Sequence, residues 1–466
     1  MDFSPTNTFL NEDFLLQNKT SKLLYHEFAA DMPIIDYHNH LSPKVMSENK
    51  VFSNINSAWL DDDHYKWRVM RARGIDENEI TGNASNNLKF KRWAETVPFL
   101  VRNPLFHWTH LELKRYFNIN TLLQPNTADT IFNQTNELIK RMRPLDVMKK
   151  FNVKVLCTTD DPIDNLEFHI KLSNNKTDYK ILPGFRPDNA INISDLNYIK
   201  YIEKLSFVSG NKIDSYEELL DSLKKRIEFF DINGCKISDH GLESLYSKKY
   251  DISEIEKIFK MRIAGVIPKK KEVLKFKSCI LFDLCKIYCD KGWTQQFHLG
   301  AIRNNNKILL KKIGFDVGCD SIGDFRQANS MSDFFNNLNN EDSLANTVVY
   351  NLNPSMNEVF ATMIGNFSNA KVSMQFGTAW WYLDQKDGIE KQINALSNLG
   401  LISKFIGMLT DSRSFLSFPR HEYFRRIVCN MIGKDIEAGL LPNDINFFGA
   451  IVKDICFNNA KNFFKF

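Results

Sequence analysis

The segment MPIIDYHNHLSP, residues 32–43, places two histidines one residue apart behind a short apolar run. A buried strand is predicted for that run, because it is short, rich in isoleucine and bounded by polar residues. Side chains alternate between the faces of a strand, so we expect His38 and His40 to point the same way at its end. Two such imidazoles are half of a common zinc site, although two surface histidines at a strand end would have the same sequence.

This first run is one of eight short β-rich segments that alternate with helix-like segments along the chain. Strands that alternate with helical connections indicate parallel βα units, and eight such units predict a closed (β/α)8 TIM barrel of the α/β class. Two of the connecting segments, 215–231 and 273–289, have apolar residues at helical spacing and are predicted as helices. The other predicted strands lie at 153–160, 179–185, 234–239, 293–299, 346–352, 371–377 and 405–411.

One stretch does not fit a minimal barrel. Residues 45–145 separate the first and second predicted strands, which is too long for a single βα connection. The stretch is rich in Trp, Phe and Leu, so we expect a helical insertion with its own packing. The predicted organisation is an N-terminal segment with the first barrel strand at 1–44, a mostly helical insertion at 45–145, and the remainder of the barrel with C-terminal helices at 146–466.

Composition excludes several classes of protein. Of 466 residues, 43% are apolar and 25% are charged, which is typical of a soluble globular protein. The net charge of +4 is mild and the basic residues are dispersed, so no nucleic-acid partner is expected. No apolar stretch approaches the roughly 18 residues of a membrane helix, and no leader is apparent at the N-terminus, so no membrane partner is expected. The eight scattered cysteines fit a reducing compartment, and we expect a cytoplasmic protein.

Ionisable residues follow most of the predicted strands, and in barrel enzymes the chemistry lies at these carboxyl ends. The first and eighth strands are neighbours in a closed barrel, so Asp411 could complete a site begun by His38 and His40. Two imidazoles and one carboxylate leave positions open for substrate or water, as in a catalytic divalent-metal site. Asp411 could instead cap a helix or form a loop salt bridge, and the arginines could form ordinary rim ion pairs. The other strand-end candidates are Arg186, Asp239, His298, Arg303 and Arg413.

Longer motifs carry a resemblance to a known family. A His-x-His pair after the first strand with an Asp after the eighth resembles the amidohydrolase superfamily. Four strings resemble the uronate isomerases, also called glucuronate isomerases, and the likeness runs from about residue 5 to about residue 460. These strings are DYHNHLSP at 36–43, DDDHYKWR at 61–68, FHLGAIRNNN at 297–306 and TDSRSFLSFPRHEYFRR at 410–426.

The resemblance implies an aldose–ketose isomerase of hexuronate catabolism, which converts D-glucuronate to D-fructuronate and D-galacturonate to D-tagaturonate. It implies one divalent metal ion, with zinc expected, and a small hexuronate as the substrate; the oligomeric state stays open, a homo-oligomer included. The implied metal ligands are His38, His40 and Asp411. The implied catalytic residues are His64, Tyr65, Asp411 and Arg413, and the implied substrate-binding residues are Arg186, Asp239, His298 and Arg303.

Other interpretations stay open. Many members of the superfamily have a metal-bridging lysine at the end of the fourth strand, but here Lys236 lies further back, which argues against a two-metal hydrolase. A metal-dependent hydrolase or decarboxylase on the same barrel is the main alternative, and a noncatalytic carbohydrate-binding protein is a third. His64 and Tyr65 could be packing residues of the insertion. For the segment PRHEYFRRI at 419–427 we expect only helix packing and ion pairs.

Overall fold

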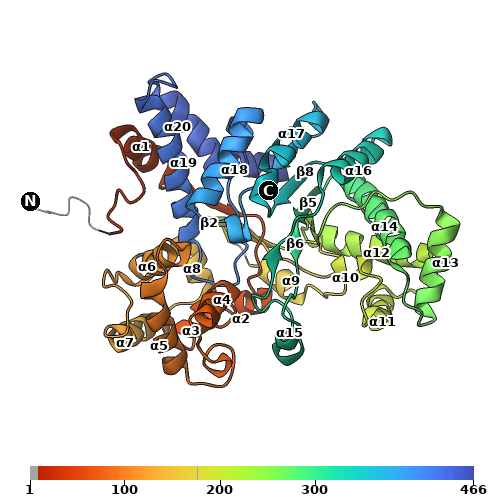
Figure 1. The fold of residues 1–466 in the computed structure, drawn as a ribbon, viewed down its shortest axis with the longest axis horizontal. Coiled ribbons are helices and arrows are strands. Elements are labelled where there is room, and N and C mark those ends of the chain that lie inside the picture. Colours follow the sequence, from red (N-terminus) through yellow and green to blue (C-terminus); the bar gives the residue numbers. More distant parts are fainter. Residues whose placement is uncertain (1–8, 176) are drawn as a thin grey trace, which may run out of the picture.

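The computed structural model describes residues 9–175 and 177–466, and it has an α/β fold with parallel sheets (Figure 1). One sheet has the order β1-β2-β3 and the other has the order β4-β5-β8-β9, and all neighbouring strands in both are parallel. The strands are β1 (Ile34–Asp36), β2 (Val153–Cys157), β3 (Lys180–Leu182), β4 (Ile237–Leu242), β5 (Thr294–Leu299), β8 (Thr347–Asn351) and β9 (Met374–Phe376). Six of them lie within their predicted segments and β4 overlaps its segment 234–239 but runs on to Leu242, so the seven predicted strands are confirmed.

The two sheets meet through Phe185, just beyond β3. Its N–H donates to the carbonyl of Ile237 at 3.0 Å, and its own carbonyl accepts from the N–H of Asp239 at 2.9 Å. A parallel bridge also joins Phe185 to Asp160, beyond β2. The carboxyl ends of β2, β3 and β4 are therefore held side by side, and side chains that follow these strands share one edge.

The eighth predicted strand, residues 405–411, is wrong: the structure has no strand there. The backbone φ is +74° at Gly407 and +48° at Asp411, so the segment is not evenly extended. Its hydrogen bonds also differ from those of a ladder, because the N–H of Thr410 donates to the side chain of Asp36 at 2.8 Å. The segment nevertheless runs beside the end of β1, as the N–H of Asp411 donates to the carbonyl of His38 at 3.2 Å.

Helices fill most of the connections between the later strands. The two predicted helices are confirmed, and the first of them begins with a capping box between Ser215 and Glu218 that satisfies its free N–H groups. The helices of this part are α9 (Glu167–Ser173), α10 (Asp188–Ile191), α11 (Tyr198–Ser209), α12 (Tyr216–Ile232), α13 (Ile252–Ile263), α14 (Lys270–Lys291), α16 (Ala328–Asn340), α17 (Asn357–Phe367), α18 (Lys386–Leu399), α19 (Pro419–Glu437), α20 (Ile445–Lys453) and α21 (Asn459–Phe464).

Before β2 the regular secondary structure of the described chain is helical apart from β1, with turns and loops between the helices. Helices α3 to α7 lie together, in the orange colours of Figure 1. None of the described helices has the length and apolarity needed to cross a bilayer. The helices are α1 (Lys19–Leu23), η1 (Leu24–Ala29), α2 (Pro43–Glu48), α3 (Ile55–Trp59), α4 (His64–Ala72), α5 (Asn86–Thr96), α6 (Pro104–Phe117), α7 (Ala128–Ile139) and α8 (Pro144–Lys150).

An excursion that the sequence did not predict follows β5. Strands β6 (Ala301–Ile302) and β7 (Ser321–Ile322) pair antiparallel and enclose α15 (Lys307–Ile313). We call residues 303–320 the flap. The flap is fastened to α4, because Arg68 donates to the carbonyl of Asp320 at 2.8 Å and Arg71 donates to that of Val317.

The PRHEYFRRI segment forms the start of α19, and its arginines are buried. Arg425 donates to the carbonyls of Met32 and Pro33, each at 2.7 Å, just before β1 begins. Arg426 pairs with Glu422 on the same helix at 2.9 Å. The expectation of helix packing and ion pairs is confirmed, and the packing fixes the strand that leads into the two histidines.

Candidate active site

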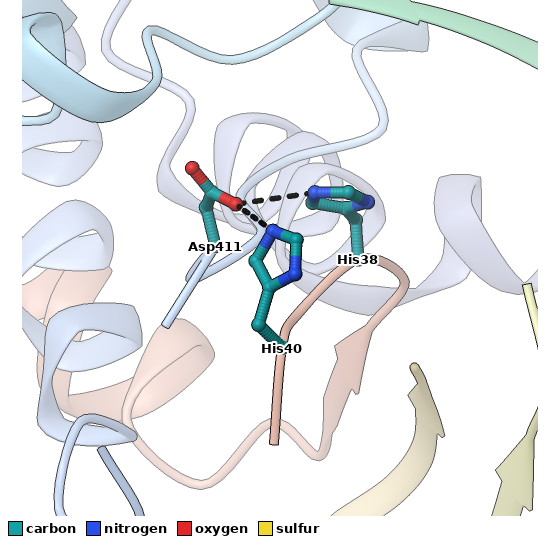
Figure 2. Close-up of side chains that lie close together, drawn as sticks. All are labelled: His38, His40 and Asp411. Carbon is teal, nitrogen blue, oxygen red and sulfur yellow. Dashed lines mark hydrogen bonds and ion pairs between the residues drawn. The ribbon is translucent and has the colours of Figure 1, made fainter. Parts of the chain in front are cut away.

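His38 and His40 converge on Asp411, although β1 itself ends at Asp36. The Nε2 atoms of both imidazoles lie 3.1 Å from the same carboxylate oxygen, Oδ1 of Asp411 (Figure 2). His38 is 3% exposed, whereas 22% of the His40 side chain is exposed and faces the cavity described below. The chain past the strand therefore brings together the three donors that the sequence predicted.

Backbone and side-chain contacts lock this arrangement. The buried carboxylate of Asp36 accepts from both the N–H and the hydroxyl of Thr410, at 2.8 and 2.6 Å. The N–H of His40 donates to the carbonyl of Ser412 at 3.0 Å, so contacts on both sides of Asp411 tie it to the His-x-His turn. Burial raises the pKa of Asp36 to about 6. Two chain segments far apart in sequence are thus clamped at the point where the ligand oxygen is presented.

The electrostatics of the cluster suit a cation. Burial alone would raise the pKa of Asp411, but hydrogen bonds from His38 and His40 hold it well below its usual range. Burial lowers the pKa of His40 to about 4, so this imidazole is neutral at pH 7. Asp411 and His40 are thus in the protonation states that metal binding needs, whereas the charges of Asp239 and Asp411 raise the pKa of His38 despite its burial, so a metal ion competes with a proton there. The ligand atoms of the three residues all lie within 4.8 Å of one another, so the donor set fits one divalent ion.

A second cluster adjoins the first and shares His38. Asp239 of β4 lies 2.7 Å from Nδ1 of His298 on β5 and 3.7 Å from Nδ1 of His38. The His298 ring is stacked on Tyr350 of β8, with centroids 4.1 Å apart. Burial would raise the pKa of Asp239, but the charge of Arg186 and those of the two histidines hold it well below its usual range. Asp239 therefore orients the His298 ring through a hydrogen bond and lies beside His38, and the buried Nε2 of His298 has no hydrogen-bond partner among the described residues.

Three arginines border the same space. Arg186 is held by two carboxylates, with Nε 2.9 Å from Asp188 and Nη1 3.2 Å from Asp239. Arg413 lies 2.9 Å and Arg303 lies 4.0 Å from opposite oxygens of Asp316, which belongs to the flap. The guanidinium of Arg303 also stacks over the Trp381 ring at 4.6 Å.

These residues surround one cavity of about 570 Å³. Most of the predicted site residues line it: His38, His40, His64, Arg186, His298, Arg303, Asp411 and Arg413. Asp239 and Tyr65 do not; Asp239 lies behind His38 and His298, and Tyr65 lies behind His64, whose ring it stacks on at 5.0 Å. Lys236 precedes β4 and pairs with Asp231 at 3.6 Å, away from this wall.

The sequence interpretation missed Asp316 and Phe315, which also line the cavity. Neither residue follows a predicted strand, so a site predicted from the residues at the carboxyl ends of the strands could not include them. The one available signal was the excess of arginine at the predicted strand ends, which requires a counter-charge. Trp380 and Trp381 also line the cavity.

A parallel α/β framework, a donor set for a divalent ion and three arginines that line the cavity together suit an enzyme for a small anionic substrate. The family model described as glucuronate isomerase matches residues 6–464. The chain belongs to this family.

Relatives and solved structures agree with the family match. The chain is 53% identical over 464 residues to a uronate isomerase of Flavobacterium johnsoniae, with 99% of both chains covered. It is 50% identical over 465 residues to a uronate isomerase of Bacteroides thetaiotaomicron, covering 98% of this chain and 99% of that one. A crystal structure of uronate isomerase from Thermotoga maritima superposes with a TM-score of 0.94 at 33% identity and covers 98% of this chain and 100% of that one. A glucuronate isomerase structure from Caulobacter crescentus has a TM-score of 0.91 at 22% identity, over 98% and 97% of the two chains, and so bears on the fold.

Proposed function

We propose that the protein is an aldose–ketose isomerase that converts D-glucuronate to D-fructuronate and D-galacturonate to D-tagaturonate in hexuronate catabolism. The observation that carries this proposal is a cavity in which three arginines face a His–His–Asp cluster. Arginine recognises carboxylates through a planar fork of donors, and the cluster fits an ion that binds sugar oxygens. A uronate supplies both groups in one small molecule.

The proposed metal ligands are His38, His40 and Asp411. A divalent ion bound there, for which we propose zinc, polarises substrate oxygens and anchors the reacting end of the sugar. The imidazole and carboxylate donors fit zinc, which accepts both kinds of ligand. The remaining steps fall to the side chains of this protein.

Moving a carbonyl from C1 to C2 requires removal of the C2 proton and transfer of a proton between the two oxygens. Asp411 is ionised and His64 lies at the cavity wall, so these two are the proposed carriers of hydroxyl protons. Arg413 has a buried Nε without a partner among the described residues, which is available to a substrate oxygen near C2. Tyr65 has the weakest support of the proposed catalytic set, because its buried hydroxyl lies behind His64 and burial raises its pKa well above the ordinary value.

The proposed substrate contacts are Arg186, Asp239, His298 and Arg303. Arg186 is fixed by Asp188 and Asp239, so its free donors are presented to the cavity at little entropic cost. His298 presents an unpartnered Nε2, and Asp239 acts by orienting that ring.

A preference for a carboxylated sugar tests the proposal. Loss of a charged hydrogen-bond pair in a desolvated site costs about 2 to 5 kcal/mol, which is roughly 30-fold to several thousandfold. Glucuronate and galacturonate should give ketose with unchanged molecular mass, and glucose should react poorly or not at all. The measurement is kcat/KM for each sugar at one pH and one metal concentration. Equal values for glucose and glucuronate would contradict the assignment, and a product of altered mass would instead favour a hydrolase or decarboxylase.

We also propose that the two sheets are parts of one (β/α)8 barrel of amidohydrolase type, with 45–145 as a helical insertion between 1–44 and 146–466. The bridges at Phe185 and the contacts of Asp411 with the end of β1 support this arrangement. All eight cysteines lie in the described residues as free thiols, which supports the proposed cytoplasmic location. The proposed partner is the small hexuronate, with no nucleic acid or membrane, and a homo-oligomer remains compatible with this proposal.

A further inference from the structure

The carboxylate of Asp316 lies between two arginines of the cavity wall. Its Oδ2 is 2.9 Å from Nη2 of Arg413, and its Oδ1 is 4.0 Å from Nη1 of Arg303. One carboxylate thus faces both cations at once, as the carboxylate of a bound hexuronate would. Burial would raise the pKa of Asp316, but the charges of Arg413 and Arg303 lower it, so the group is ionised at neutral pH.

The position of Asp316 in the flap allows its carboxylate to move away from Arg413 and Arg303. It is the middle residue of the segment Gly314–Gly318, and the φ angles of these two glycines are +93° and +82°. A Cβ at Gly318 would lie 2.7 Å from the carbonyl oxygen of His64, so this end packs directly on α4. A Cβ at Gly314 would meet nothing within 4 Å. One end of the segment is therefore fastened and the other faces open space.

The ion pairs that hold Asp316 are also more exposed to solvent, and therefore weaker, than the pair between Arg186 and Asp239. The side chains of Asp316, Arg303 and Arg413 are 48%, 37% and 28% exposed, whereas those of the Arg186–Asp239 pair are 20% and 3% exposed. Exposed ion pairs contribute little to stability and are screened by salt. Exchange of one carboxylate for another at Arg413 therefore costs little free energy. The same exchange at Arg186 would break its contact with the buried carboxylate of Asp239 as well as its contact with Asp188.

We propose that Asp316 is a specificity-determining residue, a resident counter-ion that the carboxylate of the substrate displaces from Arg413 and Arg303. This inference rests on the proposed function, since it assumes a carboxylated sugar. A neutral sugar brings no charge to replace Asp316 and leaves the arginines paired as they are. A hexuronate replaces the carboxylate of Asp316 and adds contacts through its hydroxyl groups. These added contacts offset the free energy lost when the ion pairs of Asp316 break, and a simple anion lacks them.

The neutral variant Asp316→Asn separates this role from a structural one. Asn keeps the shape of the side chain and tolerates the positive φ of +58° at this position. Removal of a partly exposed pair should lower KM for glucuronate about three- to fivefold while kcat changes less than twofold. The Ki of gluconate, a carboxylated competitor, should fall by the same factor, and that of sorbitol, a neutral competitor, should stay the same. Asp342→Asn is the matched control, since Asp342 is exposed and has a φ of +50° but lies at the end of α16.

Two results would overturn the inference. If KM and the gluconate Ki rise in Asp316→Asn, the residue positions the arginines or binds the sugar itself. If both stay within twofold of the wild type, the exchange does not occur. Direct titration of the zinc-loaded protein with gluconate, which has no carbonyl group to isomerise, decides the question without turnover, and Asp316→Ser provides a second neutral variant. A wild-type protein that forms no ketose contradicts the proposed function, whereas an active wild type with an unaltered variant contradicts this inference alone.

Discussion

Gly241 of β4 leaves space for Arg186, and Gly241→Ala should remove that space. A Cβ built at Gly241 would lie 2.1 Å from Nη2 of Arg186 and 3.3 Å from Oδ2 of Asp188. Ordinary contacts of a Cβ begin near 3.4 Å, so the guanidinium has to withdraw by about 1.3 Å, the difference between 3.4 and 2.1 Å. Because the obstacle is the far end of a flexible side chain, the strand itself is expected to survive.

The expected loss is in substrate binding and turnover, because a misplacement of about 1 Å in a catalytic arrangement can cost roughly 10²-fold. We expect kcat/KM for glucuronate to fall about 30- to 100-fold, which is about 2 to 2.7 kcal/mol. The melting temperature should change little. The assay is ketose formation over a range of glucuronate concentrations, with circular dichroism on the same samples.

Gly365→Ala provides the control for this experiment. Gly365 is exposed on α17, and a Cβ there would meet nothing within 4 Å. This variant should keep wild-type kinetics and gain slightly in helix stability. A Gly241→Ala protein with wild-type kcat/KM would refute the argument that Arg186 must occupy its present place.

Three further predictions concern the proposed metal ligands, Tyr65 and the stability of the protein at low pH. His40→Ala should lose bound metal and activity together while the fold persists; stoichiometric metal in this variant, measured by atomic emission, would contradict the three-ligand site. Tyr65→Phe should lower kcat at least about 10²-fold with little change in KM, and an unchanged kcat would leave the ring a packing role beside His64. Burial lowers the pKa of His169 to about 4, so the unfolded chain takes up a proton below about pH 6.5 that the folded chain refuses. Between pH 7.5 and 5, His169 should therefore remove about 2 kcal/mol of stability, an effect opposed by buried carboxyl groups such as Asp160 and Asp384, whose pKa values burial raises to about 7. Urea unfolding of His169→Gln should lack the His169 contribution, and an identical pH dependence in the two proteins would contradict it.

The sequence correctly predicted that His38, His40 and Asp411 converge, although one step of the argument was wrong. His38, His40 and Asp411 do meet, although residues 405–411 form no strand. The meeting depends on hydrogen bonds from Thr410 to Asp36, contacts between side chain and backbone that no periodic pattern reveals. Seven of the eight predicted strands are present, because short apolar runs between helical segments have a clear local signature.

Contacts that depend on tertiary structure could not be predicted from local sequence patterns. Asp316 lies in the flap, an antiparallel excursion whose two strands have two residues each, too short for a recognisable alternation. Tyr65 was expected beside His64 from a shared motif, but neighbours in sequence on α4 need not face the same space, and its hydroxyl lies behind that ring.

The separation of the ligands along the chain has a consequence for biosynthesis. His38 and Asp411 are 373 positions apart. At about 5 to 20 residues per second, the ribosome exposes the two histidines roughly 20 to 75 s before it makes the carboxylate that completes their cluster. Nascent chains therefore contain the two imidazoles without the carboxylate for most of their synthesis. The proposed metal site can be completed only after nearly the whole polypeptide has been translated.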